Sequence, residues 1–151
     1  MIREQRPYAL IGSPMCTAFS TWQRLNASRT RDPAGMERAR QGAILHLNFV
    51  AELYAEQLEG GRYFLHEHPN SATSWREPSV LGVLSLQGVQ RIRADQCMHG
   101  QQPDMGNPIK KPIGFMSNSP HLLDALNKRC FGRKGLCSRP EGGAHQECLG
   151  K

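Results

Sequence analysis

The stretch YALIGSPMC, residues 8–16, decides the fold that we expect for this chain. Its first four residues are an apolar run, and the Gly-Ser-Pro that follows is typical of a loop after a buried strand. The loop carries a thiol, Cys16, just beyond the predicted end of the strand. In α/β sheets, functional groups collect at the carboxyl ends of strands, so Cys16 is a candidate for chemistry.

A long amphipathic helix is predicted after this strand. Asp32-Pro33 is a helix start, with the Asp as cap and the Pro in the first helical position. Gly60-Gly61 marks the end of the helix. The apolar residues between them recur at spacings of three and four, and they are Met36, Ala39, Ala43, Ile44, Leu47, Val50, Ala51, Tyr54 and Leu58.

Shorter elements follow in alternation. We expect strands at 63–65, 89–94 and 113–116, a helix within 77–87, and a short helix from 119 to 128. This order predicts an α/β domain with a mainly parallel sheet and crossover helices, a partial Rossmann-like fold. The second strand runs into His66-Glu67-His68. Cys16 and Glu67 are therefore expected at the same edge of the sheet.

Composition limits the classes of function. The chain has 151 residues, enough for one domain, and 19 Lys plus Arg against 13 Asp plus Glu give a net charge of +6. This excess favours a polyanionic partner such as nucleic acid, and a solvated basic surface explains it equally well. No apolar run suits a membrane helix or a signal peptide. We therefore expect an intracellular protein, in cytoplasm or nucleus, with its five cysteines reduced.

The last residues form a basic tail rich in Cys and His. Cys130, Cys137, His145 and Cys148 are separated by six, seven and two residues, and three thiols with one imidazole suit tetrahedral zinc. The alternative is a disordered tail with scattered cysteines. We divide the chain into an α/β domain at 1–128 and this tail at 129–151.

The reactive residues of the domain also have structural interpretations. Cys16 could be a buried cysteine, and Glu67 could cap a helix or pair with an arginine. His66 and His68 point to the same side of an extended chain, which makes a metal site conceivable, but metal sites need three or four ligands.

Three segments resemble one enzyme family. Residues 9–20 (ALIGSPMCTAFS) resemble the nucleophile motif of cytosine-5 DNA methyltransferases, in which a strand ends in Pro-Cys and Phe-Ser follows. Residues 63–69 (YFLHEHP) resemble the family's strand ending in Glu-Asn-Val. Residues 95–100 (DQCMHG), followed by Lys110-Lys111-Pro112, resemble a variant of phage methylases. The whole chain also resembles methylase-like segments of retroelement polyproteins. The resemblance covers roughly residues 7–128 and, more loosely, the Cys/His tail.

The resemblance implies a mechanism. Cys16 would be the thiolate that adds to carbon 6 of a flipped cytosine, and Glu67 the acid that stabilises the base. Arg24, Lys110 and Lys111 would contact DNA, and S-adenosylmethionine would donate the methyl group. Met15 stands in place of a proline and His68 in place of an asparagine.

The sequence has no Gly-x-Gly turn for S-adenosylmethionine. We therefore expect a truncated methyltransferase-like domain whose cofactor-binding half is supplied in trans. The alternative is a non-catalytic nucleic-acid-binding module with a zinc-bound tail.

Overall fold

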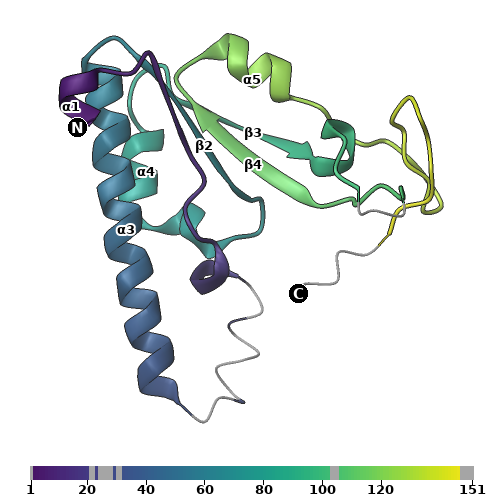
Figure 1. The fold of residues 1–151 in the computed structure, drawn as a ribbon, viewed down its shortest axis with the longest axis horizontal. Coiled ribbons are helices and arrows are strands. Elements are labelled where there is room, and N and C mark those ends of the chain that lie inside the picture. Colours follow the sequence, from purple (N-terminus) through teal and green to yellow (C-terminus); the bar gives the residue numbers. More distant parts are fainter. Residues whose placement is uncertain (1, 21–22, 24–28, 30–31, 103–105, 147–151) are drawn as a thin grey trace.

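A four-stranded mixed sheet with helices on both faces forms the protein (Figure 1). The computed structural model describes residues 2–20, 23, 29, 32–102 and 106–146. The strands are β1 (Ala9–Gly12), β2 (Tyr63–Pro69), β3 (Gln90–Asp95) and β4 (Pro112–Ser117), in the spatial order β1-β2-β4-β3. The helices are α1 (Ile2–Gln5), α3 (Pro33–Glu59), α4 (Pro78–Leu84) and α5 (Pro120–Leu126). Three short 3-10 turns, η1 (Thr17–Phe19), η2 (Thr73–Arg76) and η3 (Gln96–His99), complete the set.

The expectation of a mainly parallel sheet is correct for one strand pair only. β1 and β2 are parallel, whereas β4 is antiparallel to both of its neighbours, β2 and β3. The reason is the connection between β3 and β4, which contains no crossover helix and therefore allows antiparallel pairing. Because β2 and β3 both oppose β4, β1, β2 and β3 still run in one direction. Their carboxyl ends, with the start of β4, form one edge of the sheet, which we call the carboxyl edge.

The main core lies between the sheet and α3. Asp32 caps this helix, since its Oδ1 accepts a hydrogen bond of 2.8 Å from the amide of Gly35, and Gly60 ends it, as predicted. Leu47, Val50, Ala51 and Tyr54 form the buried stripe. The stripe packs on Phe64 and Met116 of the sheet and on Trp75, Val80 and Val83 near α4.

The opposite face of the sheet is only partly covered. α5 packs through Leu123 onto Leu65, Ala94, Ile113 and Phe115. Ile11 lies in register with Leu65, yet Ile11 is 73% exposed and Leu65 is 9% exposed. The helix layer on this face therefore ends at β2 and leaves β1 uncovered.

The tail folds back toward the carboxyl edge. Residues 129–146 contact the segment between β3 and β4 through a bridge between Ile109 and Gln146 and through buried cysteines. Figure 1 shows the tail at the opposite end of the molecule from α3. No helix among the described residues is both long and apolar enough to cross a membrane.

Candidate functional site

Two hydrogen bonds join the loop after β1 to strand β2. The hydroxyl of Ser13 donates to Oε2 of Glu67. Nε2 of His68 lies 2.7 Å from the carbonyl oxygen of Pro14. Glu67 and His68 belong to β2 itself, because β4 pairs with the strand as far as Pro69, so the predicted end of this strand was too early. The contacts confirm that the segments carrying Cys16 and Glu67 meet at the carboxyl edge.

His68 is the fixed support of this arrangement. A carbonyl only accepts, so Nε2 of His68 donates to Pro14, and Nδ1 accepts from the hydroxyl of Ser74 at 2.6 Å. Burial lowers the pKa of His68, against the opposing effects of its bond to Pro14 and of nearby Glu67. The His68 ring is 1% exposed, and each of its two nitrogens has a hydrogen bond. His68 therefore positions the loop after β1 and has no nitrogen left to bind a metal.

His66 also has a structural role. Its Nδ1 lies 3.0 Å from the hydroxyl of Tyr54, and the ring is 1% exposed. Burial, followed by the charges of His68 and Arg91, lowers the pKa of His66 to about 3. The Tyr54 hydroxyl packs so closely on Gly12 that a Cβ there would lie 2.0 Å from it. Gly12 is therefore required for β1 to approach the histidines.

Cys16 lies at the start of η1 and is partly exposed. Its carbonyl accepts from the amide of Phe19 at 3.0 Å, and the Phe19 side chain is buried in the main core. Cys16 is thus neither a core residue nor a metal ligand among the described residues. Arg24, which we expected to contact DNA, lies outside the described residues.

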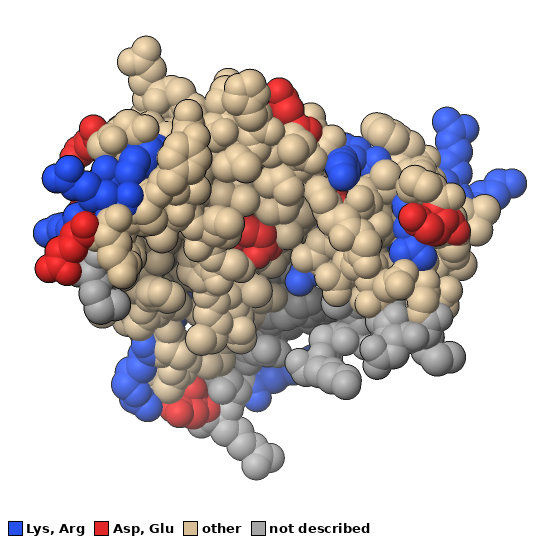
Figure 2. Space-filling model, turned by 45° about the horizontal axis from the view of Figure 1, so that its top comes forward, with Lys and Arg blue, Asp and Glu red and all other residues tan. Residues whose placement is uncertain are grey.

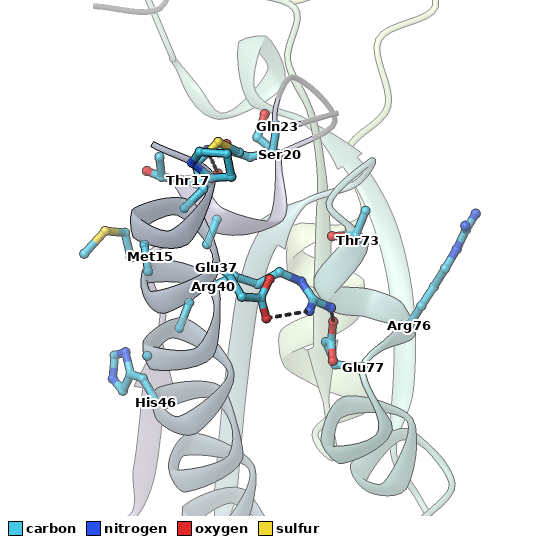
Figure 3. Close-up of a pocket in the computed structure, with 16 residues that line it drawn as sticks. Met15, Thr17, Ser20, Gln23, Glu37, Arg40, His46, Thr73, Arg76 and Glu77 are labelled. Carbon is cyan, nitrogen blue, oxygen red and sulfur yellow. Dashed lines mark hydrogen bonds and ion pairs between the residues drawn. The ribbon is translucent and has the colours of Figure 1, made fainter. Parts of the chain in front are cut away.

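A cavity of about 870 Å³ flanks the Cys16 loop (Figure 3). Met15 and Thr17, the neighbours of Cys16, line it together with residues of α3 and η2. Arg40 crosses it between Glu37 and Glu77, with nitrogen–oxygen distances of 3.9 and 3.5 Å. The volume lies in the range of small-molecule sites, which is roughly 300–1,000 Å³.

A second group of reactive side chains forms a Cys3His cluster at the carboxyl edge. The ligand atoms of Cys97, Cys130, Cys137 and His145 all lie within 4.8 Å of one another. Cys130 Sγ is 3.8 Å from Cys137 Sγ and 3.4 Å from His145 Nε2. Zinc–sulfur bonds of about 2.3 Å in a tetrahedron require sulfur–sulfur edges of about 3.8 Å and sulfur–nitrogen edges of about 3.5 Å. The cluster therefore fits a zinc ion.

The structure adds one residue to the expected ligand set. Cys130, Cys137 and His145 come together as predicted, and among the described residues the fourth member of the cluster is Cys97 of η3. Cys148, the predicted fourth ligand, lies outside the described residues. Cys97 was missed because it precedes Cys130 by a whole strand and helix, although the sequence places it directly after a predicted strand.

The backbone around the cluster holds the ligands in place. Oδ2 of the buried Asp95 accepts from the amide of Cys130 at 2.9 Å. The hydroxyl of Ser138 donates to Cys130 Sγ at 3.6 Å. A side chain at Gly132 would collide with the carbonyl of Leu136, whose oxygen lies 1.8 Å from the Cβ position. The loop is thus built to turn tightly around the thiols.

The thiols differ in acidity without metal. Burial, then the neighbouring Cys137 and Cys130, raise the pKa of Cys97 to about 12. Burial acts on Cys130 in the same direction, but hydrogen bonds from Ser138 and Gly132 outweigh it and lower its pKa to about 6. Zinc binding displaces the thiol protons, so it would release protons from Cys97 near neutral pH.

Lys110 and Lys111 lie beside the cluster, at the entry to β4. The ammonium of Lys110 donates to the carbonyl of Cys130 at 3.4 Å, and the carbonyl of Lys111 accepts from the amide of Gln96 at 3.0 Å.

Comparison of the chain with protein-family models, with curated proteins and with solved structures found no match.

Proposed function

We propose that this chain is the catalytic half of a cytosine-5 DNA methyltransferase-like enzyme, with a zinc-bound tail. The observation that carries the proposal is the pair of contacts, Ser13 to Glu67 and Pro14 to His68, that joins the Cys16 loop to β2. Through these contacts the loop that carries Cys16 meets the strand that carries Glu67 at one edge of the sheet, and α/β sheets bind ligands at such edges. Mixed sheets are common among doubly wound folds, so the reversed β4 is compatible with a partial Rossmann-like fold.

The chemistry assigns one role to each group. The Cys16 thiolate adds to carbon 6 of cytosine, a sulfur–carbon bond forms, and the electrons of the C5–C6 double bond shift toward carbon 5. Glu67 bonds to the ring nitrogen and the exocyclic amine and stabilises the adduct. The base has to leave the duplex to reach the thiol.

S-adenosylmethionine does not fit the described part of this chain. The sequence contains no Gly-x-Gly turn, and no described helix starts in a glycine-rich turn directly after a strand. We therefore propose that a second methyltransferase half binds this cofactor. The zinc of the tail, in contrast, fits its four ligands.

The proposal is best tested by a reaction that needs no methyl donor. When Cys16 adds to carbon 6, a solvent deuteron can add at carbon 5. Loss of the original C5 proton and expulsion of the thiolate then restore the cytosine with deuterium at C5. We expect wild-type protein to catalyse this exchange in a cytosine-containing DNA duplex, measured by mass spectrometry, and Cys16→Ser to abolish it.

The control for this test is the same variant's fold and DNA affinity, both of which should equal those of the wild type. DNA binding by the wild type without any C5 exchange would contradict a cytosine-adding nucleophile. Covalent trapping on a 5-fluorocytosine duplex, with and without S-adenosylmethionine, provides a second readout.

The Cys3His cluster favours a second candidate, a non-catalytic nucleic-acid-binding module. Under it, the zinc-bound tail and the basic loops around Lys110 and Lys111 hold nucleic acid, and Cys16 has no chemical role. Salt-sensitive DNA binding with no C5 exchange in the wild type supports this candidate over the enzyme.

A further inference from the structure

The tail presents an aromatic ring to solvent. Phe131 is 80% exposed, the highest value among the exposed large hydrophobic residues of the described chain. It directly follows the zinc ligand Cys130, whose amide is bound by Asp95. The amide of Phe131 itself donates to the Ser138 hydroxyl at 3.0 Å. The ring is therefore exposed on a backbone that two hydrogen bonds hold in place.

Cations flank this ring in the sequence. Residues 128–140 contain five Lys and Arg and no Asp or Glu. Arg129 pairs with Asp95, and Arg139 bonds to Gln102 and to backbone carbonyls. Lys128, Arg133 and Lys134 are exposed and form no ion pair with another of the described residues. Figure 2 shows Lys and Arg side chains projecting at the end of the molecule that Figure 1 assigns to the tail.

A tight turn presents two of these cations. The amide of Leu136 donates to the carbonyl of Arg133 at 3.0 Å, and Lys134 and Gly135 both have positive φ, 51° and 78°. Lys134 is one of only two non-glycine residues with positive φ in the described chain. A zinc ion with three thiolates has a formal charge of −1, so the attraction for anions comes from these side chains.

We propose that Phe131, with Arg133 and Lys134, is a binding site for single-stranded nucleic acid, in which an unpaired base stacks on the ring and phosphates contact the cations. This inference rests on the proposed function, from which it takes nucleic acid as the ligand. It adds that the nucleic acid is single-stranded and that these three residues bind it. Exposed aromatic rings beside cations are the features that bind unpaired bases, because every base has a stacking face and paired bases hide it. The site shares the carboxyl edge with the Cys16 loop, since Asp95 ends β3 where Pro112 begins β4.

The experiment uses the zinc-loaded full chain and fluorescence anisotropy. The probes are a labelled oligothymidylate and the duplex formed with its complement. We expect tighter binding of the single strand, and we expect Phe131→Ala to weaken it about tenfold while affecting the duplex much less. Phe131→Tyr should retain the affinity. Leu136→Ala is the matched control, because Leu136 is a 57% exposed apolar residue of the same turn.

The cations are tested through salt dependence. Replacing Arg133 and Lys134 with Gln should reduce the slope of log affinity against log salt by about 0.7 for each phosphate that the variant no longer neutralises. Zinc content and thermal midpoint should stay at wild-type values in every variant.

Three results would overturn the inference. They are equal affinity for the single strand and the duplex, an unchanged affinity in Phe131→Ala, and equally effective competition by polyglutamate, which would indicate an acidic protein partner. Two measurements separate this inference from the enzyme proposal. If the wild type shows no C5 exchange, and both the wild type and Cys16→Ser bind the single strand normally, the enzyme proposal fails and this site stands.

Discussion

His68 donates a 2.7 Å hydrogen bond to the carbonyl of Pro14, two residues before Cys16, and so fixes the loop after β1 to the inner strand β2. The same ring accepts from Ser74. The loop that carries the thiol is therefore held by a buried side chain from another strand, and its position depends on the hydrogen bonds of that ring.

Replacement of His68 with Ala should loosen the loop. Two buried partners, the Pro14 carbonyl and the Ser74 hydroxyl, would lose their bonds, which costs on the order of 1–3 kcal/mol for each group left unsatisfied. Denaturant unfolding should therefore show lower stability, and Cys16-dependent C5 exchange should fall more than DNA affinity. His121→Ala, an exposed histidine of α5, is the control. Equal losses of exchange and of DNA affinity would contradict a positioning role.

Acid should destabilise the protein through His66. Its pKa in the folded protein, about 3, lies below the ordinary value of 6.5, so between these values the unfolded chain binds more protons than the folded one. Its contribution to stability is therefore present above about pH 6.5 and is lost as the pH falls toward 3. Near pH 5 the free energy of unfolding should change by about 1.4 kcal/mol per pH unit from this residue. Urea melts of His66→Phe should show a slope smaller by that amount. An unchanged slope would show that the ring is not held neutral.

The metal ligands are separable by two cysteine variants. We expect purified protein to hold one zinc per chain, Cys97→Ser to lose it, and Cys148→Ser to keep it, because the tetrahedron is complete with Cys97. Metal analysis and the absorption of a cobalt-substituted sample would measure both. Zinc retained in Cys97→Ser and lost in Cys148→Ser would instead assign the four ligands of the tail alone.

Asp95 should control metal affinity without touching the ion. It bonds to the amide of Cys130, and groups that orient metal ligands typically change affinity by about 10–100-fold when replaced. We expect Asp95→Asn to weaken zinc binding in a chelator competition by at least the lower value. Asp124→Asn on α5, an exposed carboxylate, should leave zinc affinity unchanged.

Two glycines give opposite expectations for the same substitution. Gly12→Ala would place a Cβ 2.0 Å from the Tyr54 hydroxyl, so the strand or the ring has to move, at a cost of about 1–3 kcal/mol. Gly42→Ala, within α3, meets nothing within 4 Å and should stabilise the helix by roughly 0.5–1 kcal/mol. Thermal unfolding of the two variants compares them directly. A neutral Gly12→Ala would contradict the close packing of β1 against Tyr54.

Features with local causes could be predicted from the sequence. The cap at Asp32, the apolar spacing of α3 and its end at Gly60 all lie within one segment, and the helix has those bounds. The direction of β4 depends on pairing with β2, which is distant in the chain. The missing crossover helix before β4 was nevertheless a usable signal for antiparallel pairing.

The candidate site shows the same contrast between residues close in sequence, which could be predicted, and contacts between distant segments, which could not. Cys130, Cys137 and His145 are close in sequence and were predicted together, whereas Cys97 joins them only because the tail folds back on η3. The role of His68 could not be inferred from spacing, since its partner is a backbone carbonyl of another segment. A polar residue at the end of a strand indicates a position of interest but not which group it bonds.

The Cys3His cluster also has a topological consequence. Its ligands Cys97 and Cys130 stand before and after the segment that contains β4 and α5, so bound zinc closes that segment into a loop. β4 is an inner strand of the sheet, paired on both sides. A zinc ion bound there would act as a cross-link around β4, the strand that joins β2 to β3, much as a disulfide would in an oxidising compartment. Chelation of the zinc would remove this cross-link. Because β4 lies between β2 and β3, loss of β4 from the sheet would separate β3 from the other strands.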